Sequence, residues 1–310
     1  MIRLSPLLRQ LPWLCLLLMA ACTAPRSVIH SGKVTPRGQF KAGGNLGFNV
    51  GTSSIGKITG AVKSLAEQAI TQDTVNYRPA LDKVQEAALA YVLDPTVATS
   101  DLYVRYGVVD RLDVGYKYSF GAHSFDAMYQ FMGPTGTPEK PGGPANANYG
   151  SVGLQFSTQR AKLPNIPFLD DAQTLLGFTA KRIDLLVPVV FSHSFGNEEE
   201  IGNVSYGLAY SRSFVKYGFE PGKIFSYVPG STTVTEKIPS LLAKKSYGAL
   251  GGFVNLKLGY RYAYFLPALA IYYQNYGTYK LLNNKEAKLK GVTIIPSLGV
   301  QFRIPAGKNR

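Results

Sequence analysis

One short stretch of the chain offers a nucleophile beside a general base. Residues 192–194 read Ser-His-Ser, and three consecutive glutamates follow at 198–200. A serine hydroxyl activated by a histidine, which a carboxylate orients, is the arrangement used for acyl transfer. Apolar and polar residues alternate over 182–195, so His193 falls on the opposite face from both serines. We therefore favour a histidine beside an acidic turn over a hydrolytic site, and expect that the protein is not an enzyme.

The sequence contains few of the residues and motifs that bind metals or cofactors. The only histidines are His30, His123 and His193, and they are far apart in the chain. A zinc site needs three or four clustered nitrogen, sulfur or carboxylate ligands. The sequence also lacks a glycine-rich phosphate loop, a G-x-S-x-G segment and an H-E-x-x-H segment. We expect no metal site and no cofactor.

The clearest structural element is the stretch 101–120, DLYVRYGVVDRLDVGYKYSF. Outside the turn, its even-numbered residues are aromatic or aliphatic, and the residues between them are mostly charged or small. Two alternating runs joined by a short turn at 109–111 predict a β-hairpin. In a soluble sandwich the polar face would meet water. In a membrane barrel the apolar face meets lipid and the polar face lines the lumen.

The same alternation recurs through most of the chain. The clearest further segments are 39–50, 124–131, 149–158, 182–195, 203–219, 250–258 and 292–304. Together they predict an all-β antiparallel barrel of about ten strands, with eight to twelve compatible, in one domain over 38–310. An even number of strands places both ends of the barrel, and the short turns at 109–111, 196–202 and 259–261, on one side. In 203–219 the apolar residues change phase, which predicts a bulge near 212–214.

A helical pattern interrupts the strands once, over 55–93. Apolar residues recur at helical spacing in two runs; Pro79 stands at the start of the second run and Pro95 follows its end. The pattern predicts a helical hairpin inserted between the first two strands. It could act as a plug or a partner-docking element, or as an amphipathic cap on the barrel mouth, which is the interpretation we favour.

The polar face of the predicted strands carries ten charged residues of both signs. They are Lys41, Asp101, Arg105, Asp113, Lys117, Asp126, Arg182, Asp184, Lys257 and Arg303. Six basic and four acidic groups in one lumen could make a weakly anion-selective pore or an ion-paired, filled interior. A ten-stranded barrel is only slightly wider than an eight-stranded one, whose interior is filled by side chains. We therefore favour the filled lumen.

The first 21 residues have the features of a secretory signal. Arg3 and Arg9 form a basic start, an apolar run covers 11–19, and small residues precede Cys22. The placement of Cys22 resembles the lipobox of bacterial lipoprotein precursors. That resemblance implies cleavage before Cys22, acylation of its thiol and a lipidated tether over 22–37; ordinary cleavage with a free thiol is the alternative. Because Cys15 would leave with the signal, we expect no disulfide.

The strand pattern over about 38–304 resembles Gram-negative outer-membrane β-barrel proteins. The composition agrees, with 20 Tyr, 16 Phe and 32 Gly against one Trp. The resemblance implies an outer-membrane location. One departure is that Phe302 is followed by an eight-residue tail, whereas such barrels often end in an aromatic residue. A soluble, lipid-anchored β-barrel or sandwich is the alternative.

The formal net charge of +14 favours anionic partners. An exported chain without a basic helix does not fit nucleic acid, so we expect outer-membrane lipid headgroups and lipopolysaccharide phosphates as partners. Four lysines in a predicted loop over 274–290 suit such headgroups: Lys280, Lys285, Lys288 and Lys290, with a single Glu286 among them. Nothing in the sequence specifies an oligomeric state.

Taken together, these features favour an outer-membrane lipoprotein barrel with a structural or surface-binding role. Two alternatives remain open from the sequence. One is a small-solute pore with a helical plug, and the other is a lipid-modifying hydrolase that uses His193.

Overall fold

The computed structural model describes residues 26–71, 77–119, 121–161, 177–220, 225–226, 236–237, 239–282 and 285–305. The predicted signal segment and Cys22 lie outside these ranges.

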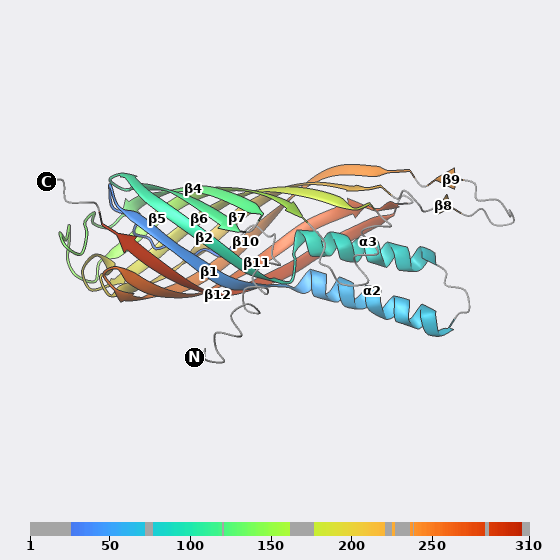
Figure 1. Ribbon diagram of the computed structural model, residues 1–310, viewed down its shortest axis with the longest axis horizontal. Helices are drawn as coiled ribbons and strands as arrows, with labels where there is room; N and C mark the ends of the chain where they lie inside the picture. Colours follow the sequence, from blue (N-terminus) through green and yellow to red (C-terminus); the bar gives the residue numbers. More distant parts are fainter. Residues whose placement is uncertain are drawn as a thin grey trace, which may run out of the picture.

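Ten antiparallel strands close into one barrel, as the alternation predicted (Figure 1). The barrel strands are β1 (Phe40–Gly51), β2 (Val97–Val109), β3 (Leu112–Ser119), β4 (Ala122–Met132), β5 (Asn148–Ala161), β6 (Thr179–Phe195), β7 (Gly202–Phe219), β10 (Leu241–Tyr260), β11 (Ala263–Lys280) and β12 (Glu286–Ile304). Closure occurs where β1 pairs with β12, with Phe40 opposite Ile304. A separate small sheet joins β8 (Phe225–Ser226) and β9 (Glu236–Lys237).

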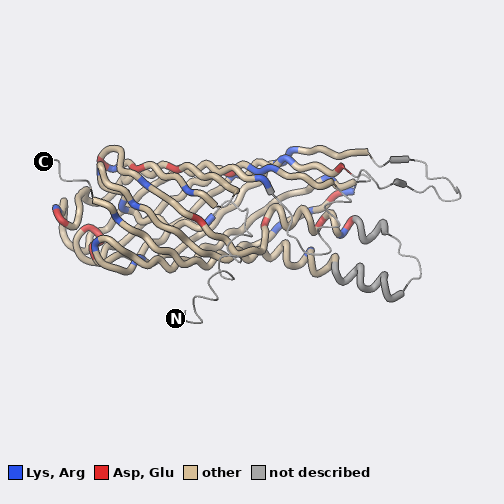
Figure 2. The backbone as a smooth tube through the Cα atoms, in the orientation of Figure 1, with Lys and Arg blue, Asp and Glu red and all other residues tan. Residues whose placement is uncertain are grey.

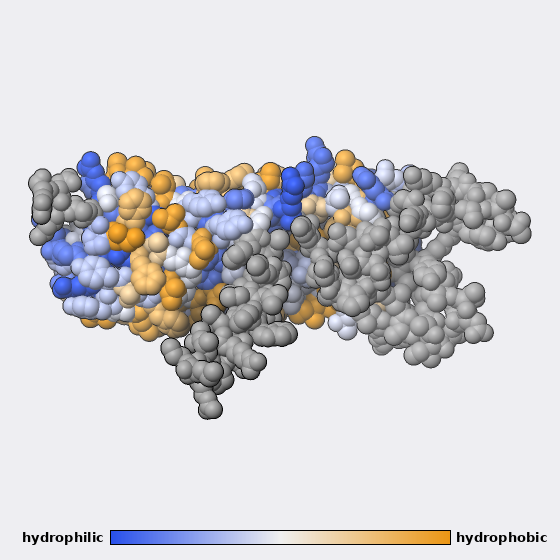
Figure 3. Space-filling view, in the orientation of Figure 1, coloured by the Kyte–Doolittle hydropathy of each residue, from blue (hydrophilic) through white to orange (hydrophobic). Residues whose placement is uncertain are grey.

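The barrel wall is apolar outside and polar inside. On β7, Leu208 is 62% exposed on the outer face, while Ser211 and Ser213 are buried on the inner face. The outer surface therefore carries hydrophobic side chains along the length of the barrel (Figure 3). This is the reverse of the arrangement in a water-soluble sheet, whose apolar face is the covered one.

The predicted helical hairpin follows the first strand. It consists of α2 (Thr52–Thr71) and α3 (Tyr77–Leu93). Strands β6, β7, β10, β11 and β12 have 17 to 20 residues against 8 to 13 in β2, β3 and β4. The helices stand beside the far ends of these long strands, away from the C-terminus (Figure 1). Neither described helix has the length and apolar character needed to span a membrane.

The interior becomes apolar where α3 meets the long strands. Leu89 and Leu93 of α3 are buried there in one cluster with Tyr217, Phe219 and Tyr279. This packing closes the barrel mouth at the end that carries the helices. It is the position that the capping interpretation assigns to the hairpin.

The bulge predicted in β7 is absent. Strand β7 pairs with β6 and with β10 in unbroken register through 212–214. Val215, Tyr217 and Phe219 keep their inward phase and are buried. The phase of the apolar residues changes because the interior itself changes, from a polar lumen to the apolar core around α3.

Both ends of the barrel chain and the short turns lie together. Phe40 at the start of β1 is opposite Ile304 on β12 and Tyr106 on β2, close to the turn between β2 and β3. Because successive strands are antiparallel, the turns after β6 and β10 and the loop after β4 fall at this same end. We call it the turn end, and the opposite end the helix end.

Candidate functional site: the filled lumen

The segment before β1 lies inside the barrel. Val28, Ile29, Val34 and Thr35 are each at most 5% exposed. Residues 26–35 of the predicted tether are therefore not a solvated linker, because the lumen offers them both apolar contacts and hydrogen-bond partners. We call residues 26–37 the inner segment.

Arg26 fixes the inner segment near the helix end. Its guanidinium donates hydrogen bonds to Gln274 Oε1 at 2.5 Å and to the Tyr247 hydroxyl at 2.9 Å. The Tyr272 hydroxyl donates to the Arg26 carbonyl oxygen at 2.9 Å. Because Tyr247 also packs in the core around α3, this anchor joins the inner segment to the closed mouth.

Wall side chains also bind the backbone of the inner segment. Thr35 N donates to Asp113 Oδ2 at 2.7 Å, and Gly32 N donates to Ser192 Oγ at 3.1 Å. A Cβ at Gly32 would lie 2.6 Å from the Tyr149 carbonyl oxygen, so only glycine fits this close approach. The path of the segment is therefore set by specific contacts with the strands.

The turn between β6 and β7 holds the inner segment at the turn end. It contains the short helix η1 (Asn197–Glu199), in which Glu198 and Glu199 have left-handed φ angles of 51° and 61°. These angles direct both carboxylates into the lumen mouth, at a cost in backbone strain that their contacts offset. Sequence analysis treated this stretch only as an acidic turn.

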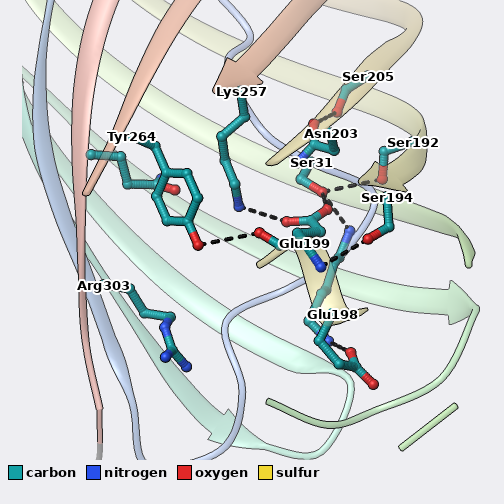
Figure 4. A network of polar contacts seen from close by, with 12 residues as sticks. Ser31, Ser192, Ser194, Glu198, Glu199, Asn203, Ser205, Lys257, Tyr264 and Arg303 are labelled. Carbon is teal, nitrogen blue, oxygen red and sulfur yellow. Dashed lines mark hydrogen bonds and ion pairs between the residues drawn. The ribbon is translucent and has the colours of Figure 1, made fainter. Parts of the chain in front are cut away.

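The two glutamates bind the inner segment and the wall together (Figure 4). Glu198 pairs with Lys33 and accepts hydrogen bonds from Gly142 N at 2.8 Å and the Tyr149 hydroxyl at 3.1 Å. Glu199 accepts from Lys257 Nζ at 2.7 Å and from the Ser31 hydroxyl. Burial alone would raise the pKa of the Glu199 carboxyl, but the charges of Lys257 and Lys41 hold it below its usual range.

All ten charges assigned to the polar face are less than a tenth exposed. Several form ion pairs within the wall. Arg105 pairs with Asp126 and, at 2.5 Å, with Asp113. Arg182 Nε donates to both oxygens of Asp184 at 2.8 Å.

The other charges have different partners. Lys257 pairs with Glu199, and Arg303 with Glu139 of the loop after β4. Lys41 Nζ lies 3.3 Å from the Lys33 carbonyl oxygen, and Asp101 accepts from Asn45 at 2.6 Å. The Nζ of Lys117 has no hydrogen-bond partner among the described residues. The lumen is thus largely an internally paired network.

Little space remains between the inner segment and the wall. The cavity beside His30, Lys41 and Arg105 has a volume of about 20 Å³. That is room for about one water molecule. At the turn end a hollow of about 360 Å³ is lined in part by Lys33, Arg37 and Arg111.

The serine and histidine residues at 192–194 do not form a catalytic pair. Ser192 Oγ is bound to the inner segment, whereas His193 lies on the outer face with its Nδ1 2.8 Å from Asn148 Oδ1. Of the three glutamates nearby, Glu198 and Glu199 form ion pairs in the lumen network, and Glu200 pairs with Arg261. Within the described ranges no group of three or more metal-ligating side chains occurs.

The four lysines assigned to headgroups are all exposed near the helix end. Their predicted loop is largely strand: Lys280 ends β11, and Lys288 and Lys290 lie on β12. The loop was predicted because the charged residues hide the alternation. Lys285 pairs with Asp82 of α3, and Lys280 is opposite Glu286.

Comparison with known proteins adds the following. No protein-family model matches the chain, and no curated protein matches it. Similar solved structures are Gram-negative outer-membrane β-barrels. The attachment invasion locus protein Ail of Yersinia pestis has 10% identity and a TM-score of 0.30, over 86% of this chain and 99% of that one. The outer membrane protein OprG from Pseudomonas aeruginosa has 9% identity and a TM-score of 0.30, over 89% and 100%.

Proposed function

We propose that the protein is an outer-membrane β-barrel that is sealed by its own inner segment and has a structural or surface-binding role. The observation that carries this proposal is the placement of residues 26–35 in the lumen, where eight of the ten are buried and strand side chains bind their backbone. A lumen filled in this way leaves little room for a solute to pass between the described residues. The role must therefore reside in its outer wall and its two ends.

The outer wall supports a membrane location. Exposed side chains such as Leu154, Leu208 and Leu250 would be costly in water over an entire barrel. Lipid would cover them, and the polar inner face would remain sealed from lipid. A soluble barrel predicts the opposite behaviour, namely solubility without detergent.

The proposal includes lipid anchoring at Cys22. The position of this cysteine after Ala20 and Ala21 supports acylation. Cys22→Ala should abolish labelling by a fatty-acid probe, and Cys15→Ala should leave labelling intact. Persistent labelling of the Cys22→Ala variant would show that the anchor is elsewhere.

The partners of the surface-binding role would be outer-membrane lipids and lipopolysaccharide phosphates. Lys288 and Lys290 point outward from β12, and neither forms an ion pair among the described residues, although Glu286 precedes Lys288 by two residues on the same face. Lys280 and Lys285 face acidic groups, so we expect them to contribute less.

Planar-bilayer recordings test the sealed barrel against a pore. Wild type should insert, show heat-modifiable gel mobility and give no steady conductance. Deletion of residues 55–93 should also be silent, because the inner segment remains in place. Steady conductance of the wild type, or of the deletion variant, would favour the plugged pore instead.

A lipid hydrolase is the least supported alternative. Its histidine and serines lie on opposite faces of β6. Any lipid-hydrolysing activity of a preparation should therefore be the same in wild type and in His193→Ala.

A further inference from the structure

Four basic residues are in cross-strand register on the outer wall. Arg160 of β5 is opposite Lys181 of β6, Lys181 is opposite Lys216 of β7, and Lys216 is opposite Lys244 of β10. All four side chains are exposed. We call them the basic row.

No carboxylate among the described residues compensates the charge of this row. Like charges directly opposite each other on neighbouring strands are destabilising. Among the described residues no carboxylate forms an ion pair with any of the four, although Lys57 and Lys285 elsewhere do have such partners. A row of unpaired cations at strand spacing indicates that a ligand outside the protein supplies the counter-charge.

The outward basic residues of the described barrel strands are restricted to β5, β6, β7, β10, β11 and β12. The lysines and arginines on β1, β2, β3 and β4 are Lys41, Arg105 and Lys117, and all three face the lumen. One group of Lys and Arg positions lies near the middle of the long axis, where the long strands pass beyond the short ones, and others lie along the barrel toward the turn end (Figure 2). The outward positive charge of the strands is therefore confined to one part of the barrel surface.

The basic row lies on the helix-end side of most of the apolar wall, and Leu242 of β10, 65% exposed, lies beyond it. The next outward row toward the turn end contains Ile183 opposite Phe214, which are 42% and 46% exposed. Further along, Phe191 is opposite Tyr206, ten residues from Lys181 on β6. Ten residues of a tilted strand cover about 25 Å, the height of the apolar band of a membrane barrel.

We propose that the basic row binds a lipid whose headgroup carries two or more phosphate groups. This inference rests on the proposed membrane location. Neighbouring strands are about 4.8 Å apart, so the four cations extend over about 14 Å, more than one phosphate can contact. The apolar row beside them receives the acyl chains, which a soluble polyanion lacks. The ligand is therefore an amphiphile with a multiply charged head.

The test compares two lipids on full-length protein in neutral detergent. One is a diphosphorylated disaccharide lipid, and the other is phosphatidylglycerol at a concentration that matches the total charge. Native mass spectrometry reports the bound lipid. The variant Lys181→Gln/Lys216→Gln removes the two central charges of the row, and Arg37→Gln/Lys140→Gln removes two exposed charges at the turn end.

Wild type should bind the diphosphorylated lipid in preference to phosphatidylglycerol. The row variant should bind it about twenty-five-fold more weakly, because each of the two basic side chains near an anionic headgroup contributes about fivefold. The turn-end variant should match wild type. Equal loss in both variants, or equal binding of the two lipids by wild type, would overturn the proposal.

Two further readouts separate this proposal from the proposed function. Heat-modifiable mobility of both variants in vesicles shows that the barrel still folds and inserts; loss of insertion in wild type would contradict the membrane location itself. The deacylated diphosphorylated disaccharide should compete poorly. Competition equal to that of the lipid would mean that the row binds soluble polyanions, and would overturn the assignment to a lipid.

Discussion

At the scale of single residues, the lumen depends on a few charged groups that bridge separate parts of the chain. The Glu199 carboxylate accepts hydrogen bonds from Lys257 of β10 and from Ser31 of the inner segment. The three side chains lie inside the barrel mouth at the turn end (Figure 4). A buried ion pair contributes modestly as a pair, but loss of one partner leaves an unpaired buried charge. Single-residue changes at this position should therefore have large effects.

Glu199→Gln should destabilise the barrel by about 3–5 kcal/mol, since Lys257 would keep its buried charge without a carboxylate partner. The measurement is the free energy of unfolding in urea, followed by the loss of heat-modifiable mobility. Glu200→Gln is the matched control, because the Arg261 side chain with which Glu200 pairs is 41% exposed. It should change stability little. Equal effects of the two variants would contradict the role of Glu199.

Glu139 gives a pH-dependent prediction. Its hydrogen bond with Arg303 lowers the pKa of the carboxyl from 4.5 to about 2. A lowered pKa in the folded state adds stability above the ordinary pKa, and this is lost as the pH falls through the folded value. Wild type should therefore be more stable than Glu139→Gln at pH 6, and the difference should shrink below about pH 4.5 and vanish near pH 2. A difference that is independent of pH would contradict the assignment.

At the scale of elements, the sequence predicts the strands better than it predicts the segments between them. Strict alternation is visible in the sequence because the inner and outer faces differ in polarity at every step. The pattern failed at Val215, Tyr217 and Phe219, where both faces become apolar beside α3. It also failed at Lys288 and Lys290, where charged outward residues made strand β12 look like a loop.

If lipid covers the outer wall, a charged residue placed there should lower the free energy of unfolding by an amount that depends on its depth in the membrane. Leu154 lies midway along the apolar wall on β5, and Thr158 lies next to the basic row. Leu154→Arg should lower the free energy of unfolding in lipid by about 2–4 kcal/mol, whereas Thr158→Arg should lower it by about 1 kcal/mol or less. Both can be measured by urea titration in vesicles. Equal tolerance of the two arginines would indicate that water, not lipid, surrounds the wall.

At the scale of the whole molecule, the main feature is a barrel that contains its own N-terminal segment. The inward direction of the ten wall charges could be predicted from strand phase alone. The inner segment could not, because its residues have no strand or helix period and its partners lie on distant strands. The signal available was weak: Val28, Ile29 and Val34 are more apolar than a solvated tether requires. The inward turn of Glu198 and Glu199 depends on backbone angles that the sequence does not reveal.

The central claim is that the inner segment occupies the lumen in the folded barrel. Ser31 Oγ lies 3.1 Å from Ser192 Oγ, so Ser31→Cys/Ser192→Cys should form an intramolecular disulfide. Ser31→Cys/Ser124→Cys is the control, because Ser124 is buried on the inner face of β4, where it bonds to Ser157 instead. The measurement is the fraction of membrane-inserted protein cross-linked under mild oxidation, read as a gel shift that a reductant reverses. We predict a nearly complete cross-link for the first pair and little for the control; equal cross-linking of the two pairs, or none in either, would contradict the account.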